Sequence, residues 1–187
     1  MTDKRADILK ATLQLISEHG FHGTPMSKIA EQAGVGAGTI YRYFESKETL
    51  INELFLELKK QISQAMLFGF SEEASTEETF RRVLRNTFDY CIQNPQEMFF
   101  LEQYHNSPFL TPETEAATLQ YLAPLVDAFE SAAQAGAIKE FSFEMFSIFV
   151  YDMTVALAKR HISGAMPMDE AQLDIAFQAC WDAVRAG

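Results

Sequence analysis

Three glycines stand close together in the stretch Ala33 to Phe44, AGVGAGTIYRYF, directly before a tyrosine–arginine–tyrosine run. A glycine-rich loop that binds a phosphate group needs a strand before its glycines and a helix after them. Here the preceding residues, SKIAEQA, have the pattern of an amphipathic helix, and the third glycine is at the wrong spacing for a dinucleotide-binding motif. No lysine follows where a nucleoside-triphosphate motif requires one. The stretch therefore argues against a phosphate-binding loop of either kind.

A helix, a short turn containing glycine and a second helix make a helix-turn-helix, and this stretch fits that order. Gly34 can adopt the left-handed backbone conformation that ends the first helix, and Val35 can fill the corner between the two helices. Gly36 and Gly38 then lie at the N-terminal end of the second helix, the end that enters the major groove of DNA in such motifs. A helix-turn-helix that serves only as a packing corner would have the same pattern. The apolar residues expected in its small core are Ile29, Ala30, Ala33, Ile40 and Phe44.

A different class of chemistry is suggested by Glu102 and His105, which are spaced as in the Glu-x-x-His motifs of di-iron helical bundles. Such a site needs a second Glu-x-x-His pair and two further glutamates, and no other histidine has a glutamate three residues before it. A helical-bundle metal protein of the di-iron type is kept as the alternative function. Because no nucleophile elbow or other catalytic motif is present, we predict no enzyme activity, no cofactor and no metal.

The elements that must position these residues are all helical by their hydrophobic spacing. Thr24 followed by Pro25 is typical of an N-cap and a first helical residue, and Ser46 is the expected N-cap of the helix after the glycine-rich stretch. Pro124 should kink or split its helix. We therefore predict an all-α fold of about nine helices, at about 3–19, 24–33, 36–43, 46–68, 76–93, 95–106, 112–135, 142–163 and 169–185.

The net charge of −11 is unevenly distributed along the chain. Residues 1–50 hold six of the 15 basic and six of the 26 acidic residues, so the whole net charge lies in residues 51–187. A neutral head on an acidic body can present a basic face to DNA phosphates while the body stays away from them. Ordinary solubilising surface charge would give the same distribution.

The two cysteines and the apolar segments give no sign of secretion or of a membrane span. Cys91 and Cys180 are solitary, as expected of buried thiols in a reducing cytoplasm. The N-terminus lacks the apolar region of a secretion signal, and the most apolar segment, 141–158, is broken by Glu144 and Asp152. We predict a cytoplasmic protein without a membrane partner.

The run from Gly20 to Leu50, GFHGTPMSKIAEQAGVGAGTIYRYFESKETL, resembles the DNA-binding region of the TetR family of transcriptional repressors. The matching features keep a fixed register and are Gly20-Phe21, Thr24, Ile29-Ala30, Ala33-Gly34-Val35, Gly38-Thr39-Ile40-Tyr41, Tyr43-Phe44, Lys47-Glu48 and Leu50. The rest of the chain resembles the family only in length, helicity and helix order. The resemblance implies a three-helix helix-turn-helix DNA-binding domain at 1–46 and a larger helical ligand-binding and dimerisation domain at 47–187.

The function implied by this resemblance is that of a ligand-responsive transcriptional repressor. Such a protein binds a palindromic operator in double-stranded DNA as a homodimer and is released by a small-molecule inducer. By the family pattern Tyr41, Tyr43 and Lys47 mostly contact the DNA backbone, and Arg42 is the best candidate for a guanine contact. The full set of expected DNA-binding residues is Thr24, Ser27, Lys28, Gly36, Ala37, Thr39, Tyr41, Arg42, Tyr43 and Lys47.

One departure from the family pattern lies at Gly36-Ala37, where many relatives have Ser-Lys or another polar pair. The missing cation removes one phosphate or base contact, so binding should either be weaker or depend more on Arg42 and on DNA shape. Lys4 and Arg5 could compensate by reaching the DNA backbone from the N-terminal arm.

The middle helices are rich in Phe, Met and Tyr, which can line an apolar pocket, so an apolar or aromatic inducer is expected. The acidic body favours neutral or cationic inducers over anionic ones. The expected ligand-binding residues are Phe88, Cys91, Met98, Phe99, Tyr104, Tyr121 and Phe149. The family resemblance implies that the last two long helices form the dimer interface, with Met145, Ile148, Phe177 and Trp181 as its apolar residues. Burial of the same residues in the core of a single chain is the alternative.

Overall fold

The computed structural model describes residues 3–105 and 107–187, and within these ranges the regular elements are all helices. One isolated β-bridge pairs Ile138 with Arg185. The helices are α1 (Lys4–His19), α2 (Met26–Gln32), α3 (Ala37–Tyr43), α4 (Lys47–Met66), α5 (Thr76–Gln93), α6 (Pro95–His105), α7 (Pro112–Gln120), α8 (Ala123–Gln134), α9 (Phe143–Ser147), the π-helical turn η1 (Ile148–Asp152), α10 (Met153–Ile162) and α11 (Glu170–Val184). The predicted all-α fold is confirmed.

The described ranges contain ten helices when the uninterrupted run α9–η1–α10 is counted as one, against about nine expected. The extra helix comes from residues 112–135, which Pro124 divides into α7 and α8. Proline lacks a backbone N–H and is tolerated only in the first turn of a helix, which is where Pro124 lies in α8. The expected end of the sixth helix at Asn106 lies outside the described residues, and α6 is assigned to His105.

Several helix ends have the caps that their sequences predict. Ser46 Oγ accepts a hydrogen bond from the backbone N–H of Thr49 at the start of α4. The second helix differs from the prediction, because Pro25 rather than Thr24 occupies its N-cap position and α2 starts at Met26. Thr24 Oγ1 instead donates to the carbonyls of Leu15 and Gly20, so its hydroxyl closes the preceding turn.

The helices divide into two compact units. The first unit contains residues up to Lys60 together with Gln96–Thr118, and the second contains Gln61–Pro95 and Leu119–Gly187. The expected domain boundary between residues 46 and 47 remains a prediction. No helix in the described ranges is long and apolar enough to cross a membrane.

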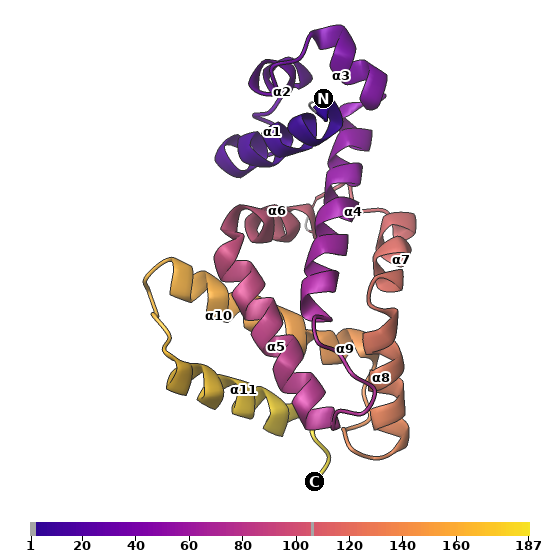
Figure 1. Cartoon of the computed structure of the whole chain (residues 1–187), viewed down its shortest axis with the longest axis vertical. Coiled ribbons are helices and arrows are strands. Elements are labelled where there is room, and N and C mark those ends of the chain that lie inside the picture. The colour runs from indigo at the N-terminus through magenta and orange to yellow at the C-terminus, as the bar shows by residue number, and fades with distance from the viewer. Residues whose placement is uncertain (1–2, 106) are drawn as a thin grey trace. The chain divides into compact units, whose positions relative to one another are not determined.

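In the first unit, α2 packs against both α1 and α3 (Figure 1). An ion pair of 2.6 Å between Arg5 and Glu53 joins α1 to α4. The buried Tyr104 of α6 stacks on Phe55 of α4 with 3.8 Å between ring centroids. The Tyr104 hydroxyl lies 2.7 Å from Asn52 Oδ1 and 2.9 Å from the carbonyl oxygen of Phe109. Burial raises the pKa of Tyr104, so its phenol stays a neutral hydrogen-bond donor.

In the second unit, α5 packs against α10, η1 and α11 (Figure 1). Its amphipathic pattern explains this arrangement, because apolar residues repeat at helical spacing on one side of α5 and are buried there, namely Phe80, Val83, Leu84, Phe88 and Cys91. Ser75 and Glu78 form a reciprocal capping box at the start of α5. Arg85 on the polar side binds Asp89 and Glu170, which ties α5 to the start of α11.

Replacing Tyr104 by phenylalanine should lower the free energy of unfolding by about 1–2 kcal/mol, because two acceptors lose their buried donor. Tyr121→Phe is the matched control, since the Tyr121 hydroxyl has no hydrogen bond within the described ranges and its removal should change stability by less than about 0.5 kcal/mol. Urea unfolding followed by circular dichroism measures both variants. Equal stability of the two variants would contradict this role of Tyr104.

Candidate functional site

The turn between α2 and α3 has the geometry that its glycine predicts. Ala33 is the C-cap of α2, and Gly34 follows with φ of +64°, the left-handed conformation that favours glycine. The backbone N–H of Val35 donates to the carbonyl of Ala30 at 2.9 Å, and Gly36 is the N-cap of α3. The chain therefore reverses within three residues and enters α3 directly, as in a helix-turn-helix.

The short helix α3 has one buried side and one exposed side. Ile40 and the following Phe44 are buried, together with Ile29 and Ala30 of α2. Arg42 lies opposite these buried residues, and it is flanked by Tyr41, 56% exposed, and Tyr43, 45% exposed. These large side chains are left in water beside the exposed Arg42. The helix thus presents two aromatic rings and a cation outward from a packed base.

Nothing inside the described protein requires glycine at the two positions that begin α3. Gly36 and Gly38 both have negative φ, since neither is among the glycines with positive φ. A Cβ atom on Gly36 would come no closer than 3.8 Å to Thr39 Oγ1, and one on Gly38 would meet nothing within 4 Å. Glycine inside a helix costs about 1 kcal/mol relative to alanine. The missing side chains leave open space on the outer surface, where another molecule can approach the backbone.

The expected DNA-binding residues differ in how accessible the structure leaves them. Thr24 is fully buried and its hydroxyl is already bound to two carbonyls, which favours a structural role in the turn. Lys47 is half-buried and its ammonium donates to the carbonyl of Phe21, and burial lowers the pKa of Lys47. Thr39 is half-buried. The exposed members of the set are Ser27, Lys28, Gly36, Ala37, Tyr41, Arg42 and Tyr43.

The cations of the first unit are not equally available to a partner. Arg5, expected as a possible DNA contact, is paired with Glu53 and lies over the Phe44 ring at 5.7 Å. Arg42 and Lys28 have no ion-pair or hydrogen-bond partner for their side chains within the described ranges and are exposed. Their charges are therefore available to a phosphate or a base edge at the α2–α3 surface.

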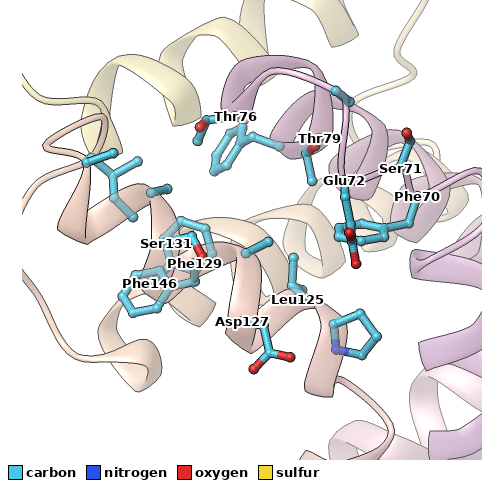
Figure 2. Close-up of a pocket in the computed structure, with 17 residues that line it drawn as sticks. Phe70, Ser71, Glu72, Thr76, Thr79, Leu125, Asp127, Phe129, Ser131 and Phe146 are labelled. Carbon is cyan, nitrogen blue, oxygen red and sulfur yellow. The ribbon is translucent and has the colours of Figure 1, made fainter.

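A pocket of about 520 Å³ lies within the second unit (Figure 2). Its walls come from the segment between α4 and α5, the first turns of α5, α8 and α9. Figure 2 shows Thr76 and Thr79 of α5 facing Leu125 and Phe129 of α8. Its volume falls in the range of small-molecule sites, roughly 300–1,000 Å³.

None of the seven expected ligand-binding residues lines this pocket. Phe88 and Cys91 are buried on α5, and burial raises the pKa of the Cys91 thiol to about 12. Tyr121 and Phe149 are half-buried elsewhere in the second unit. Met98, Phe99 and Tyr104 belong to α6 of the first unit, with Met98 and Tyr104 buried and Phe99 exposed.

The sequence analysis did not predict that the polar segment between α4 and α5 contributes residues to a pocket. Phe70, Ser71 and Glu72 from this segment line the pocket together with Phe80 and Phe129, which belong to the aromatic-rich middle helices. The spacing of aromatic residues alone does not separate pocket residues from core residues, because both lie on the buried side of a helix.

The four expected dimer residues separate into two pairs. Phe177 and Trp181 are buried within the second unit, where the Trp181 ring contacts Phe80 at 5.4 Å between centroids. Met145 and Ile148 are 50% and 47% exposed. On α11 the large apolar residue Ile175 is 71% exposed.

The Glu102 and His105 pair has exposed side chains on α6. In the part of the chain that the structure describes, no group of three or more His, Cys, Asp or Glu side chains is placed to hold a metal ion. A di-iron site needs six such ligands from four helices, so the pair lacks the neighbours that this chemistry requires.

Comparison with known proteins gives two family matches and close structural relatives. Residues 8–54 match "Bacterial regulatory proteins, tetR family", and residues 75–185 match "Tetracyclin repressor-like, C-terminal domain". A fatty acid metabolism regulator protein of Bacillus subtilis (strain 168) is 32% identical over 139 residues, which cover 73% of this chain and 72% of that protein.

Solved structures agree with these matches. A TetR family transcription regulator from Marinobacter aquaeolei VT8 superimposes with a TM-score of 0.93 at 30% identity, over 98% of this chain and 96% of the other. FadR from Bacillus subtilis, solved in complex with stearoyl-CoA, has a TM-score of 0.74 at 22% identity over 96% of this chain and 99% of the other, and shares the fold. The helix-turn-helix at the N-terminus and the helical second unit are those of these regulators, and the chain belongs to the TetR family of bacterial transcriptional regulators.

Proposed function

We propose that this regulator is a repressor that binds a palindromic operator in double-stranded DNA as a homodimer and leaves it when a small-molecule inducer binds. The observation that carries the proposal is the exposed side of α3, where Arg42 is free of any ion pair in the described ranges and Gly36 and Gly38 leave the backbone uncovered. A helix with these features can enter the major groove with its N-terminal end foremost.

The contacts on DNA follow from the exposure of each residue. Arg42 can donate two hydrogen bonds to the O6 and N7 atoms of a guanine, the most frequent specific contact in the major groove. Tyr41 and Tyr43 can donate to phosphates from the two flanks of α3, on either side of Arg42, and Lys28 adds a cation from α2. Lys47 joins them only by exchanging the Phe21 carbonyl for a phosphate oxygen. Base recognition thus depends mainly on one arginine.

The homodimer is supported by apolar side chains that the second unit leaves in water. Met145 and Ile148 are half exposed, and Ile175 of α11 is more exposed still. A pairing of α9–η1–α10 and α11 with their copies would bury these residues, and a twofold pairing gives the two α3 helices the symmetry of a palindrome. The half-sites of such an operator are about 34–36 Å apart, one turn of DNA.

Release by an inducer requires a connection between the pocket-bearing unit and the DNA-binding helices. Helix α4 contributes residues to both units, and α6 continues directly from α5 into the first unit. Within the first unit, Phe21 after α1 contacts Phe100 of α6 at 5.8 Å and Phe109 at 5.4 Å between ring centroids. An inducer that favours one arrangement of these helices shifts the population away from the DNA-binding state.

The direct test is selection of double-stranded DNA from a random pool by the ligand-free protein. The proposal expects enrichment of a palindrome whose half-sites are centred one helical turn apart. Sequences without twofold symmetry, or no enrichment at all, would reject it.

Arg42→Ala should cost about 1–3 kcal/mol in affinity for the selected operator and relax the preference at one base pair of each half-site, because the guanine contact is lost. Lys28→Ala is the control for a phosphate contact, and should weaken binding to all sequences alike and reduce the salt dependence. Gel-shift titrations at two salt concentrations on operator and scrambled DNA separate the two patterns. Uniform weakening by Arg42→Ala would remove this residue from base recognition.

Gly38→Ala should have opposite effects on folding and on DNA binding. The added methyl group meets no atom within 4 Å and improves helix propensity, so the free energy of unfolding should rise by about 0.5–1 kcal/mol. Operator affinity should fall, because the new Cβ occupies the space that the DNA needs.

The contrasting variant is Gly34→Ala, whose φ of +64° makes it destabilising. Thermal unfolding and operator titration of both variants provide the measurements. Unchanged operator affinity of Gly38→Ala would mean that the α3 backbone does not approach the duplex closely.

Ile148→Asp combined with Ile175→Asp should convert the dimer to a monomer, because each carboxylate would be buried without a partner at a cost of several kcal/mol. Leu119→Asp is the matched control, since Leu119 is 49% exposed and Ile148 is 47% exposed, but Leu119 lies on α7. Sedimentation equilibrium measures the masses. A dimer that survives the double change would place its interface elsewhere.

A further inference from the structure

The pocket of the second unit has walls that suit the apolar part of a small molecule. The Phe80 and Phe146 rings are 6.0 Å apart and the Phe129 and Phe146 rings 4.7 Å apart between centroids, so three rings form one surface of the pocket. Leu125 and Ile138 extend this surface, and both are buried. Rigid aromatic walls of this kind accept an aromatic or aliphatic body.

The polar groups of the pocket are hydroxyls and carboxylates only. Thr76, Thr79 and Ser131 contribute hydroxyls that have no hydrogen bond within the described ranges. Glu72 and Asp127 contribute carboxylates, which are exposed and have no ion pair in the same ranges. In Figure 2 the Glu72 side chain extends from its loop into the space between α5 and α8, while the Asp127 carboxylate points away from it. None of the 17 lining residues is a lysine, an arginine or a histidine.

The nearby arginines of α5 are committed to other partners. Arg81 binds Glu77 and the side-chain oxygen of Gln178. Arg82 donates to the carbonyl of Gly69, and Arg85 is held by Asp89 and Glu170. An anionic headgroup in this pocket would therefore meet the Glu72 carboxylate and no lining cation, and its burial would be unfavourable.

We infer that this pocket takes a small hydrophobic cation, an amine or quaternary ammonium compound with an aromatic or aliphatic body, and that the Glu72 carboxylate holds the positive charge. The inference rests on the proposed function, because it names the chemical class of the inducer. The apolar body lies against Phe80, Phe129 and Phe146, whose ring faces also attract a nearby cation. The hydroxyls of Thr76 and Thr79 can accept the remaining N–H donors of an amine.

This ligand class differs from that of the Bacillus subtilis FadR, which was solved with stearoyl-CoA. A coenzyme A thioester carries several phosphate charges, and a site for it needs lysine or arginine to pair with them. The charged residues that line this pocket are the acidic Glu72 and Asp127, which would repel phosphate groups. The fold that this chain shares with FadR therefore does not imply the same class of ligand.

The chain contains a built-in reporter for this site. Trp181 is the single tryptophan, and its ring lies 5.4 Å from that of Phe80, which lines the pocket. Occupation of the pocket against Phe80 should change the Trp181 emission. Binding can thus be followed on the full chain without DNA.

The test compares three probes that share one apolar body and differ in headgroup charge, namely phenylbutylamine, phenylbutanol and phenylbutyrate. Titrations followed by Trp181 emission and by calorimetry should give the tightest binding for the amine and at least about tenfold weaker binding for the carboxylate. Glu72→Gln should weaken the amine about fivefold, in line with the loss of one partly exposed ion pair, and leave the alcohol unchanged. Glu73→Gln is the matched control, because Glu73 is in the same loop but does not line the pocket.

A filling variant locates the site. Ala128 lines the pocket from α8, and Ala128→Phe should abolish binding of the amine and the alcohol alike, with folding checked by circular dichroism. Carboxylate binding as tight as amine binding would overturn the inference, and so would equal effects of Glu72→Gln and Glu73→Gln. Absence of binding by all three probes, or amine binding that survives in a folded Ala128→Phe variant, would also overturn it.

Operator binding by the ligand-free protein is measured in parallel and keeps the two proposals separate. If the protein binds the selected palindrome but the amine does not bind the protein, the repressor assignment stands and the cation inference fails. If the protein binds no DNA, the repressor assignment fails whatever the amine does. When both hold, adding the amine should lower operator affinity in the wild type more than in Glu72→Gln.

Discussion

The packing of a seven-residue helix is the constraint on which DNA recognition by this protein depends. A helix as short as α3 is not stable by itself, because its first turn costs more conformational entropy than one hydrogen bond returns. It exists because Ile40 and Phe44 are buried on one side, while the left-handed Gly34 fixes the direction from which the chain enters it. The opposite side of α3 is exposed and is not needed for packing within the described protein. On that side lie Arg42, which has no ion pair among the described residues, and the uncovered backbone of Gly38, with the exposed Tyr41 and Tyr43 on its two flanks.

The first unit is held together by contacts that also reach the segment 96–118. Tyr104 stacks on Phe55 and shares its proton between Asn52 and the Phe109 carbonyl, and Phe21 lies against Phe100 and Phe109. The chain crosses between the two units within α4, at the start of α6 and within α7. The proposed inducer in the second unit would act on the first through these three covalent connections. Because packed aromatic side chains repack between discrete arrangements and do not deform continuously, a small shift at α6 can favour a different position of the α1–α2 turn.

The pocket shows how far a residue pattern can locate a binding site. The apolar spacing identified the buried side of α5 correctly, and Phe88 and Cys91 are buried there. Of the residues expected on α6, Met98 and Tyr104 are buried and Phe99 is exposed. The pattern could not tell which buried sides face a cavity. The cavity lies where the first turns of α5 meet α8, and a polar segment that looked like a simple connection supplies Phe70 and Glu72 to it. The same limit applies to Phe177 and Trp181, whose apolar character fits a dimer interface and the unit's own core equally well.

The sequence by itself determined the all-α class, the approximate ends of most helices, an interruption at Pro124 within residues 112–135 and the helix-turn-helix register from Gly20 to Leu50. These features depend on local physics, namely helix periodicity, capping, proline geometry and the left-handed glycine, and a local pattern is sufficient to predict them. Only the tertiary structure decided that Thr24 is buried in a turn, that Arg5 and Lys47 are engaged by other groups, and where the pocket lies. Such outcomes depend on which groups distant parts of the chain bring together, and no property of the neighbouring residues specifies that.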